Sequence, residues 1–123
     1  MKNKVNYVDG FVLAVPKRNI SAYRRMAQKA GKIWREHGAL EFRECIGDDL
    51  AVKMGVPFTR IMKINRNETV FFSWITYKSR AHRDQVNAKV MKDPRLGDMD
   101  PKSMPFDVKR MAYGGFKILV DAT

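Results

Sequence analysis

The chain has 123 residues, which suits one domain over residues 1–123 and is too short for two separate cores. No apolar run approaches the ~20 residues of a membrane helix, and residues 1–4 lead directly into strand-like sequence without a secretory signal, so we expect no membrane association and a cytoplasmic location, with which the single Cys45 agrees. The net charge of +11 adds nucleic acid or another polyanion to the possible partners, although the basic residues form no dense block.

The first predicted element is a strand over residues 7–15. Gly10 permits close approach of a neighbouring strand, and Pro16 ends the strand because proline has no N–H for the ladder. Asp9 interrupts the apolar pattern. A buried carboxylate is costly without a partner, so we expect Asp9 to pair with a cation or to lie at the wet edge of a cavity.

A helix is predicted from an Asn19 N-cap to His37, with Gly38 as its terminator. Apolar and aromatic residues recur at steps of three and four along one face, which is typical of an amphipathic helix. Tyr23 and Trp34 belong to this face, so we interpret them as core residues rather than as the wall of a ligand site.

Alternation returns over residues 39–46 and predicts a second strand, with Leu40, Phe42 and Glu44 on one face. Cys45 lies on the other face. No base accompanies Cys45 in a recognisable motif, so a buried, unreactive thiol is the favoured interpretation.

Residues 70–77 are predicted to form the central strand, because they are apolar on both faces. A polar turn cluster precedes them, and residues 58–64 are expected to form a short strand leading into it. A sheet with two apolar faces needs two covers, and a chain of this length can supply one of them as a layer of helices.

The C-terminal half supplies a second helix and a last strand. Ser79 is expected to cap a helix that runs to Lys92, with His82 on its inward face. Residues 95–105 are expected to form a loop, in which Asp98 and Asp100 are too few oxygen ligands for a metal site. Residues 106–120 are predicted to form a strand with a bulge or a close backbone contact at Gly114-Gly115.

The predicted order is β-α-β-β-α-β, the ferredoxin-like α+β unit, with a four-stranded antiparallel sheet and two helices on one face. The other face would then be bare. We expect it to expose several aromatic residues and to be covered by the same face of a second copy, giving a dimeric α+β barrel with a pocket on each side. The aromatic residues considered for this face are Tyr7, Phe11, Phe42, Phe72, Trp74 and Tyr113.

Short motifs along nearly the whole chain resemble a known family. They are Tyr7-Val8-Asp9-Gly10-Phe11, Glu44-Cys45, Gly47-Asp48-Asp49, Phe72-Ser73-Trp74-Ile75, Asp93-Pro94-Arg95, Met104-Pro105-Phe106-Asp107, Lys109-Arg110-Met111 and Tyr113-Gly114-Gly115-Phe116. With these motifs the chain resembles the YbaA-like family of small bacterial proteins of unknown function. The resemblance implies a dimeric α+β barrel similar to antibiotic-biosynthesis monooxygenases, without an assigned activity.

The barrel pocket is expected to combine aromatic walls with titratable groups. Trp74 and Tyr113 would stack on a small planar molecule, and Arg110 would hold an anionic group. The protein would then be a small-molecule binding protein or a cofactor-free, monooxygenase-like enzyme, with no cofactor and no metal. The predicted site residues are Asp9, Trp74, His82, Arg110 and Tyr113.

Each of these residues also has a structural interpretation. His82 is interpreted more simply as a core imidazole, Arg110 as the partner of Asp9 or Asp107, and Trp74 as part of the dimer core. Haem-degrading monooxygenases of similar fold use an Asn, a Trp and a His. Asp9 stands where the Asn is needed, so the match to these enzymes is incomplete.

Two alternatives come from other classes of protein. RNA-recognition modules share the β-α-β-β-α-β order, but residues 70–77 contain no glycine of their signature, so we expect only weak, nonspecific contacts with phosphates. An interaction module without any ligand is the third possibility. A polar-lined hollow in the structure would favour a binding protein, and a fully packed interior would favour the interaction module.

Overall fold

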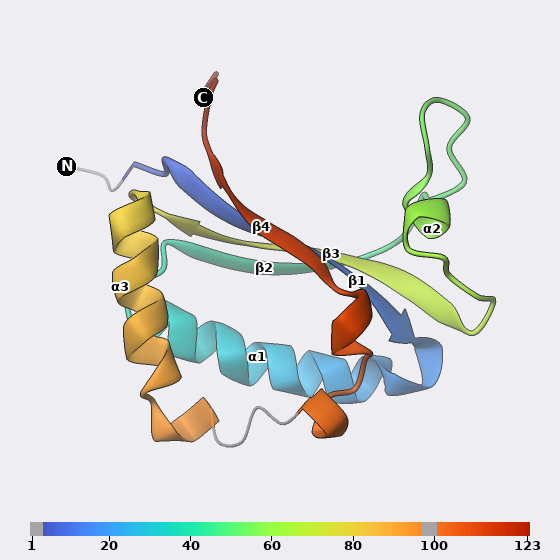
Figure 1. Ribbon diagram of the computed structural model, residues 1–123, viewed down its shortest axis with the longest axis horizontal. Coiled ribbons are helices and arrows are strands. Elements are labelled where there is room, and N and C mark those ends of the chain that lie inside the picture. Colours follow the sequence, from blue (N-terminus) through green and yellow to red (C-terminus); the bar gives the residue numbers. More distant parts are fainter. Residues whose placement is uncertain (1–3, 97–100) are drawn as a thin grey trace.

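The computed structural model describes residues 4–96 and 101–123, which form a four-stranded sheet with helices on one face (Figure 1). The strands are β1 (Tyr7–Pro16), β2 (Glu41–Ile46), β3 (Glu68–Tyr77) and β4 (Ala112–Lys117). Their order is β2-β3-β1-β4, and every neighbouring pair is antiparallel. The predicted α+β, ferredoxin-like architecture is therefore confirmed.

Two long helices, α1 (Ile20–Glu36) and α3 (Arg80–Met91), pack on the same face of the sheet. Ser79 begins α3 as predicted, because its hydroxyl accepts a hydrogen bond from the His82 N–H at 3.0 Å. Gly38 follows α1 with φ +117°, a conformation that favours glycine. We had expected Asn19 to cap α1 with its side chain, and this was wrong. The Asn19 amide donates to the Pro105 carbonyl instead.

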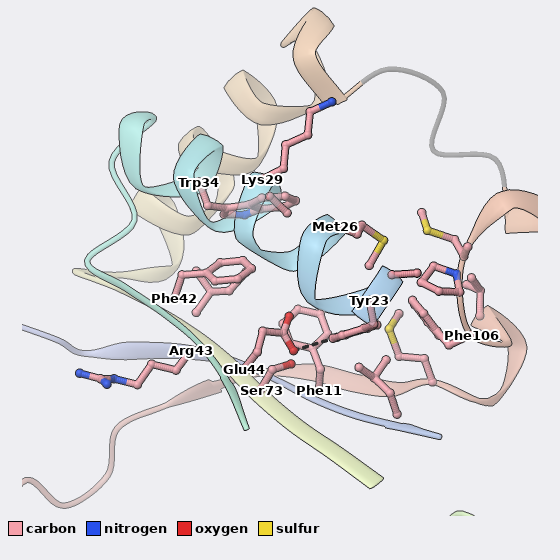
Figure 2. Close-up of a pocket in the computed structure, with 18 of the residues that line it drawn as sticks. Phe11, Tyr23, Met26, Lys29, Trp34, Phe42, Arg43, Glu44, Ser73 and Phe106 are labelled. Atoms are coloured by element: carbon pink, nitrogen blue, oxygen red, sulfur yellow. Dashed lines mark hydrogen bonds between the residues drawn. The ribbon is translucent and has the colours of Figure 1, made fainter. Parts of the chain in front are cut away.

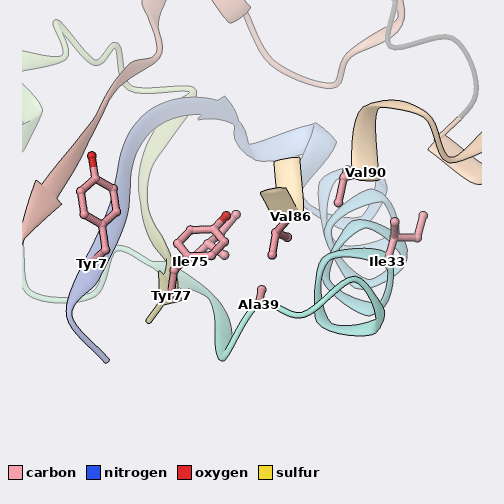
Figure 3. Close-up of a cluster of buried hydrophobic side chains, with 7 residues drawn as sticks. All are labelled: Tyr7, Ile33, Ala39, Ile75, Tyr77, Val86 and Val90. Carbon is pink, nitrogen blue, oxygen red and sulfur yellow. The ribbon is translucent and has the colours of Figure 1, made fainter. Parts of the chain in front are cut away.

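The core lies between the sheet and these helices and is divided into two clusters. The larger cluster joins Tyr77 and Ile75 of β3 to Ile33 of α1 and to Val86 and Val90 of α3 (Figure 3). The second cluster lies toward the other end of α1 and contains Leu13, Val15, Tyr23, Ala27 and Phe71. Along the helix face of β3, Ser73 is the small residue between Phe71 and Ile75, so the two clusters are separated at this point.

One predicted strand is absent. Residues 58–61 form a single helical turn, α2 (Phe58–Ile61), and β3 begins only at Glu68. The turn starts after Pro57, and the Met62 N–H donates to the Phe58 carbonyl at 2.9 Å. Apolar residues three apart lie on one side of a helical turn, and alternation over so short a run could not distinguish this from a strand.

The last strand is shorter than predicted. Residues 106–111 lie outside the strand, and a 3₁₀ turn (Val108–Arg110) precedes β4. Gly114 and Gly115 pair in continuous register with Gly10 and Asp9, so no bulge interrupts the strand. A side chain at Gly115 would collide with the Tyr7 ring, which confirms the close contact expected at the glycine pair.

The face of the sheet opposite the helices is apolar and uncovered within the described residues. It presents Phe72 and Phe116, which are 43% and 61% exposed, beside the ring of Trp74. Three of the aromatic residues considered for this face belong to the helix face instead, because Tyr7, Phe11 and Phe42 pack in or against the core. Tyr113 stacks on Phe11 at the β4 edge and also lines the hollow of the open face. Among residues 4–96 and 101–123, no helix combines the length and apolar character needed to cross a bilayer.

Candidate functional site

A pocket of about 560 Å³ lies between α1, the middle of the sheet and the segment formed by residues 103–111 (Figure 2). It forms where small residues face one another, namely Ala22 and Ala30 on α1 and Ser73 on β3. A volume of this size is typical of small-molecule sites. This pocket lies between the sheet and the helices, and the pocket expected between the two sheets of a dimer stays a prediction.

Aromatic rings form much of the pocket wall. Trp34 packs against Phe42 with ring centroids 6.1 Å apart, and Tyr23 meets Phe106 edge to face at 5.7 Å. The Trp34 indole N–H donates to Asn87 Oδ1 at 3.2 Å, which fixes the orientation of the Trp34 ring. Aromatic walls with fixed orientation suit a planar ligand. The remaining apolar lining comes chiefly from Phe11, Leu13, Met26, Ile75, Leu96, Met104, Pro105, Val108 and Met111.

One end of the pocket is polar. The buried Tyr23 hydroxyl donates to Glu44 Oε1 at 2.7 Å (Figure 2). Ser73 also hydrogen-bonds the Glu44 carboxylate. Glu44 lies on the edge strand and is exposed as a whole residue, whereas its carboxyl group is turned inward. Burial raises the pKa of this carboxyl against the opposing effect of the two hydrogen bonds, and burial followed by the adjacent carboxylate raises the pKa of the Tyr23 hydroxyl.

The segment of residues 103–111 covers one side of the pocket. The Asn19 amide donates to the Pro105 carbonyl at 2.9 Å, and Phe106 packs on Tyr23, so both contacts tie the segment to α1. At its end, the Arg110 guanidinium donates to Glu68 Oε2 at 2.6 Å and to the Met62 carbonyl at 2.9 Å. These contacts give Arg110 a structural role, with Glu68 as its partner in place of Asp9 or Asp107.

Asp9 is buried on the helix face and pairs with a cation, which was the first of the two possibilities that we considered for it. The partner is Arg83 of α3, whose Nη1 lies 3.0 Å from Asp9 Oδ1. The guanidinium also lies over the Tyr7 ring, 5.2 Å from its centroid. Burial raises the pKa of Asp9, and Arg83 opposes that rise. The pair joins α3 to β1 and does not line the pocket.

The other predicted site residues lie in different places. His82 contacts the Tyr77 ring edge to face, and its Nδ1 accepts from the Lys78 N–H at 2.9 Å; burial, followed by nearby Lys78, lowers its pKa. The Trp74 ring lies on the open face with Phe72, and Tyr113 stacks on Phe11 at the β4 edge. Trp74 and Tyr113 line the same hollow on the open face, whereas Asp9, His82 and Arg110 lie elsewhere, so the five residues do not all converge on one cavity.

The residues that form the polar end of the pocket were not among those predicted from the sequence. Glu44 had been placed on the same strand face as Phe42, and Ser73 was a small polar residue in an otherwise apolar strand. These two positions together could have indicated the site, because a carboxylate and a hydroxyl on neighbouring strands interrupt an apolar core with polar groups. Tyr23 had been assigned to the core, and it is indeed buried there.

No group of three metal-binding side chains occurs among the residues that the structure describes. Asp98 and Asp100, considered above as too few ligands for a cation, lie outside the described residues.

Comparison with known proteins identifies the family. A family model described as "Protein of unknown function (DUF1428)" matches residues 6–108. The chain belongs to the DUF1428 family. It is 47% identical over 117 residues to the uncharacterized protein YbaA of Escherichia coli K12, of E. coli O157:H7 and of Shigella flexneri, covering 95% of this chain and 99% of each relative. The predicted YbaA-like relationship is confirmed, and the matched range of this DUF1428 member includes Tyr23, Glu44 and Ser73.

Proposed function

We propose that the protein binds a small, planar, largely apolar molecule in the pocket between α1 and the sheet, with a hydroxyl or N–H group of that molecule directed at Glu44. The observation that carries this proposal is the combination of aromatic walls with one polar end, where Tyr23 and Ser73 orient the carboxylate. A few convergent polar groups in an apolar pocket are typical of sites that fix a ligand's orientation.

The charges around the pocket narrow the class of ligand. A carboxylate at the inner end repels an anionic group, so an anionic tail would have to lie at the rim. Lys29 stands at that rim, whereas the Arg43 side chain points away from the pocket (Figure 2). The ligand is therefore neutral at its inner end, and a negatively charged substituent is tolerated only beside Lys29.

Binding of naphthalene derivatives tests this proposal, with 2-naphthol as donor probe and 2-methoxynaphthalene as its donor-free control. We expect 2-naphthol to bind about tenfold more tightly, because the ether leaves Glu44 without a hydrogen bond. Ala30→Phe should abolish binding by filling the pocket, whereas Ala88→Phe, on the exposed side of α3, should not. Equal binding by the two variants, or no binding of either probe by the wild-type protein, would contradict the proposal.

Glu44 also suits an enzymatic version of this function, in the cofactor-free class that we expected. A carboxyl with a raised pKa beside a bound hydroxyl can act as a general base that removes the hydroxyl proton. Glu44→Gln would then keep a planar ligand and lose the proton acceptor. The ultraviolet spectrum of bound 2-naphthol distinguishes the two proteins: a shift of its absorption band to longer wavelength in the wild-type protein, caused by a hydrogen bond to the carboxylate and missing in the variant, supports this role, and identical spectra oppose it.

We further propose that a second copy of the chain covers the open face of the sheet. This face carries a shallow apolar hollow of about 660 Å³, whose lining includes Val12, Phe72, Trp74 and Phe116. An apolar patch on a sheet face is costly to leave in water, and a two-fold dimer buries the same patch on both subunits. Such a dimer also removes the sheet surface on which an RNA-recognition module would stack bases.

Polyanion binding is the alternative, and the basic surface of α1 favours it. Arg25 and Lys29 of α1 are exposed, and so is Arg18 just before the helix. Contacts of this kind are made to phosphates without sequence preference and weaken steeply with salt. Retention of a single-stranded oligonucleotide at physiological salt would support this alternative, and its complete loss would leave only nonspecific attraction.

A further inference from the structure

A second groove, of about 590 Å³, lies outside the pocket along the edge of the sheet, between α1 and β2. Its floor is apolar and includes Ala27, Gly31, Phe42, Ile46 and Phe71. Gly31 permits this shape, because a Cβ at that position would lie 2.8 Å from the Phe42 ring. The polar side chains of α1 along the groove are Arg24, Gln28, Lys32 and Arg35.

The backbone of β2 is open along this groove. Within the described residues β2 is an end strand, hydrogen-bonded to β3 alone. The Gly47 N–H donates to the Val70 carbonyl, and in an antiparallel ladder such bonded positions alternate. Residues 41, 43 and 45 therefore bond to β3, whereas the N–H and C=O groups of Phe42, Glu44 and Ile46 point away from the sheet. The same three residues line the groove.

The charge of the groove is strongly positive. Arg24 and Lys32 are exposed and take part in no ion pair among residues 4–96 and 101–123. Arg35 donates to the Ala39 and Leu40 carbonyls, which holds its guanidinium beside the start of β2. The acidic residue in the groove, Glu44, accepts from Tyr23 and so faces inward.

We propose that this groove binds an extended acidic peptide segment of another protein, which pairs with β2 as a fifth strand and directs its carboxylates at α1. The dimensions agree: Arg24 and Arg35 are eleven residues apart on α1, or roughly 16 Å, and the six residues of β2 span roughly 17 Å. Backbone pairing with a sheet edge gives affinity, and the apolar floor and cationic rim select the side chains.

Two other occupants fit the groove less well. A second copy of this chain would bring the same cations together, because each copy carries a net charge of +11. A nucleic acid would find phosphate contacts on α1 but would leave the apolar floor and the open backbone groups of β2 unmatched. The peptide interaction is independent of the small-molecule pocket and does not require that proposal to hold.

The probe for this proposal is a fluorescein-labelled peptide of alternating glutamate and valine, measured by fluorescence anisotropy with the full chain. Two control peptides separate the contributions: lysine in place of glutamate reverses the charge, and N-methylation of alternate residues removes the backbone donors. We expect saturable binding of the first peptide and at least about tenfold weaker binding of both controls. Binding of the N-methylated peptide with unchanged affinity would overturn strand addition.

Matched double variants locate the contact. Arg24→Glu with Lys32→Glu should weaken peptide binding by at least about tenfold, whereas Arg25→Glu with Lys89→Glu changes the net charge equally away from the groove and should have little effect. When the peptide binds, the backbone amide signals of Phe42, Glu44 and Ile46 in NMR spectra should shift, and these amides should gain protection from hydrogen exchange. Equal losses in both double variants, unchanged amides, or tighter binding of an oligonucleotide than of the peptide would each overturn the proposal.

Discussion

The two faces of β3 differ in how they are covered. On the helix face, Phe71, Ile75 and Tyr77 are almost completely buried against α1 and α3. On the other face, Phe72 is 43% exposed, and its ring meets Trp74 and Phe58 without a covering layer among the described residues. One strand therefore contributes to a buried core on one side and to an exposed apolar surface on the other.

This difference underlies the two proposals made for the two faces. The helix face contains the interruption at Ser73, where the pocket and its carboxylate lie, and it is the face that we propose for a small molecule. The open face contains a continuous apolar surface with few polar groups, and it is the face that we propose for a protein partner. Sequence reasoning had combined residues from both faces in one site.

The largest effect should come from the buried ion pair on the helix face. Arg83→Met leaves the Asp9 carboxylate buried without its cation, and we expect a loss of about 3–5 kcal/mol in the free energy of unfolding. Arg80→Met, at the exposed start of α3, should change it by less than about 0.5 kcal/mol. Urea unfolding at neutral pH measures both.

The pH dependence of this loss follows from the direction of the Asp9 pKa. Burial raises that pKa in the folded protein, so the folded protein retains the proton to higher pH than the unfolded chain does. Without Arg83 the pKa rises further, and the folded state is destabilised as the pH rises through it. The loss should therefore be smaller near pH 4 than near pH 7. A loss that is the same at both values would contradict a charged, unpaired Asp9.

The next effect should appear on the open face as a change in association. Phe72→Asp places a carboxylate in the proposed interface, and we expect the dimer dissociation constant to rise by at least about 100-fold, or roughly 2.7 kcal/mol. Met91→Asp is the matched control, because Met91 is exposed on α3, away from this face. Analytical ultracentrifugation measures both. A wild-type protein that sediments as a single subunit at micromolar concentration would refute the dimer.

A smaller effect is expected from a larger side chain at Ser73, the small residue at the polar end of the pocket. Ser73→Val removes the hydroxyl that contacts Glu44 and narrows the polar end of the pocket, so 2-naphthol should bind about tenfold more weakly. Calorimetric titration measures this change. Cys45→Ala, on the other face of the neighbouring strand, serves as the control and should bind as the wild-type protein does. Equal affinity in the Ser73→Val protein would show that the ligand does not reach this end.

The architecture was predictable from the sequence because its signals are local. The strand-length apolar run of residues 70–77, the spacing of apolar residues in α1 and the Ser79 cap each depend on neighbours within a few residues, and all three were confirmed. The strand expected over residues 58–64 was wrong because a run of that length is compatible with either period. Only the contacts of Pro57 and Met62 reveal a helical turn.

The site was less predictable because it depends on which distant residues meet. Arg83 was one of many scattered cations, and nothing in the local pattern distinguished it from Arg110 as the partner of Asp9. Similarly, Glu44 and Tyr23 are separated by the turn at Gly38, and their hydrogen bond follows from the packing of α1 on β2. Periodicity gives the face of a residue, and it does not give its partner.

The smallest predicted effect sharpens the assignment of Glu44 to the helix face. Because burial raises the pKa of its carboxyl above the ordinary 4.5, the folded protein binds this proton more tightly than the unfolded chain does. Stability should therefore fall slightly as the pH rises from 4.5 through the raised pKa, and it should level off above that value.

Glu44→Gln removes this contribution, so its melting temperature should vary less with pH between about 4.5 and 6.5 than that of the wild-type protein. A wild-type protein that gains stability relative to Glu44→Gln over this range would mean that the Tyr23 and Ser73 hydrogen bonds outweigh burial, and Glu44 would then be a weaker base than the proposed chemistry needs.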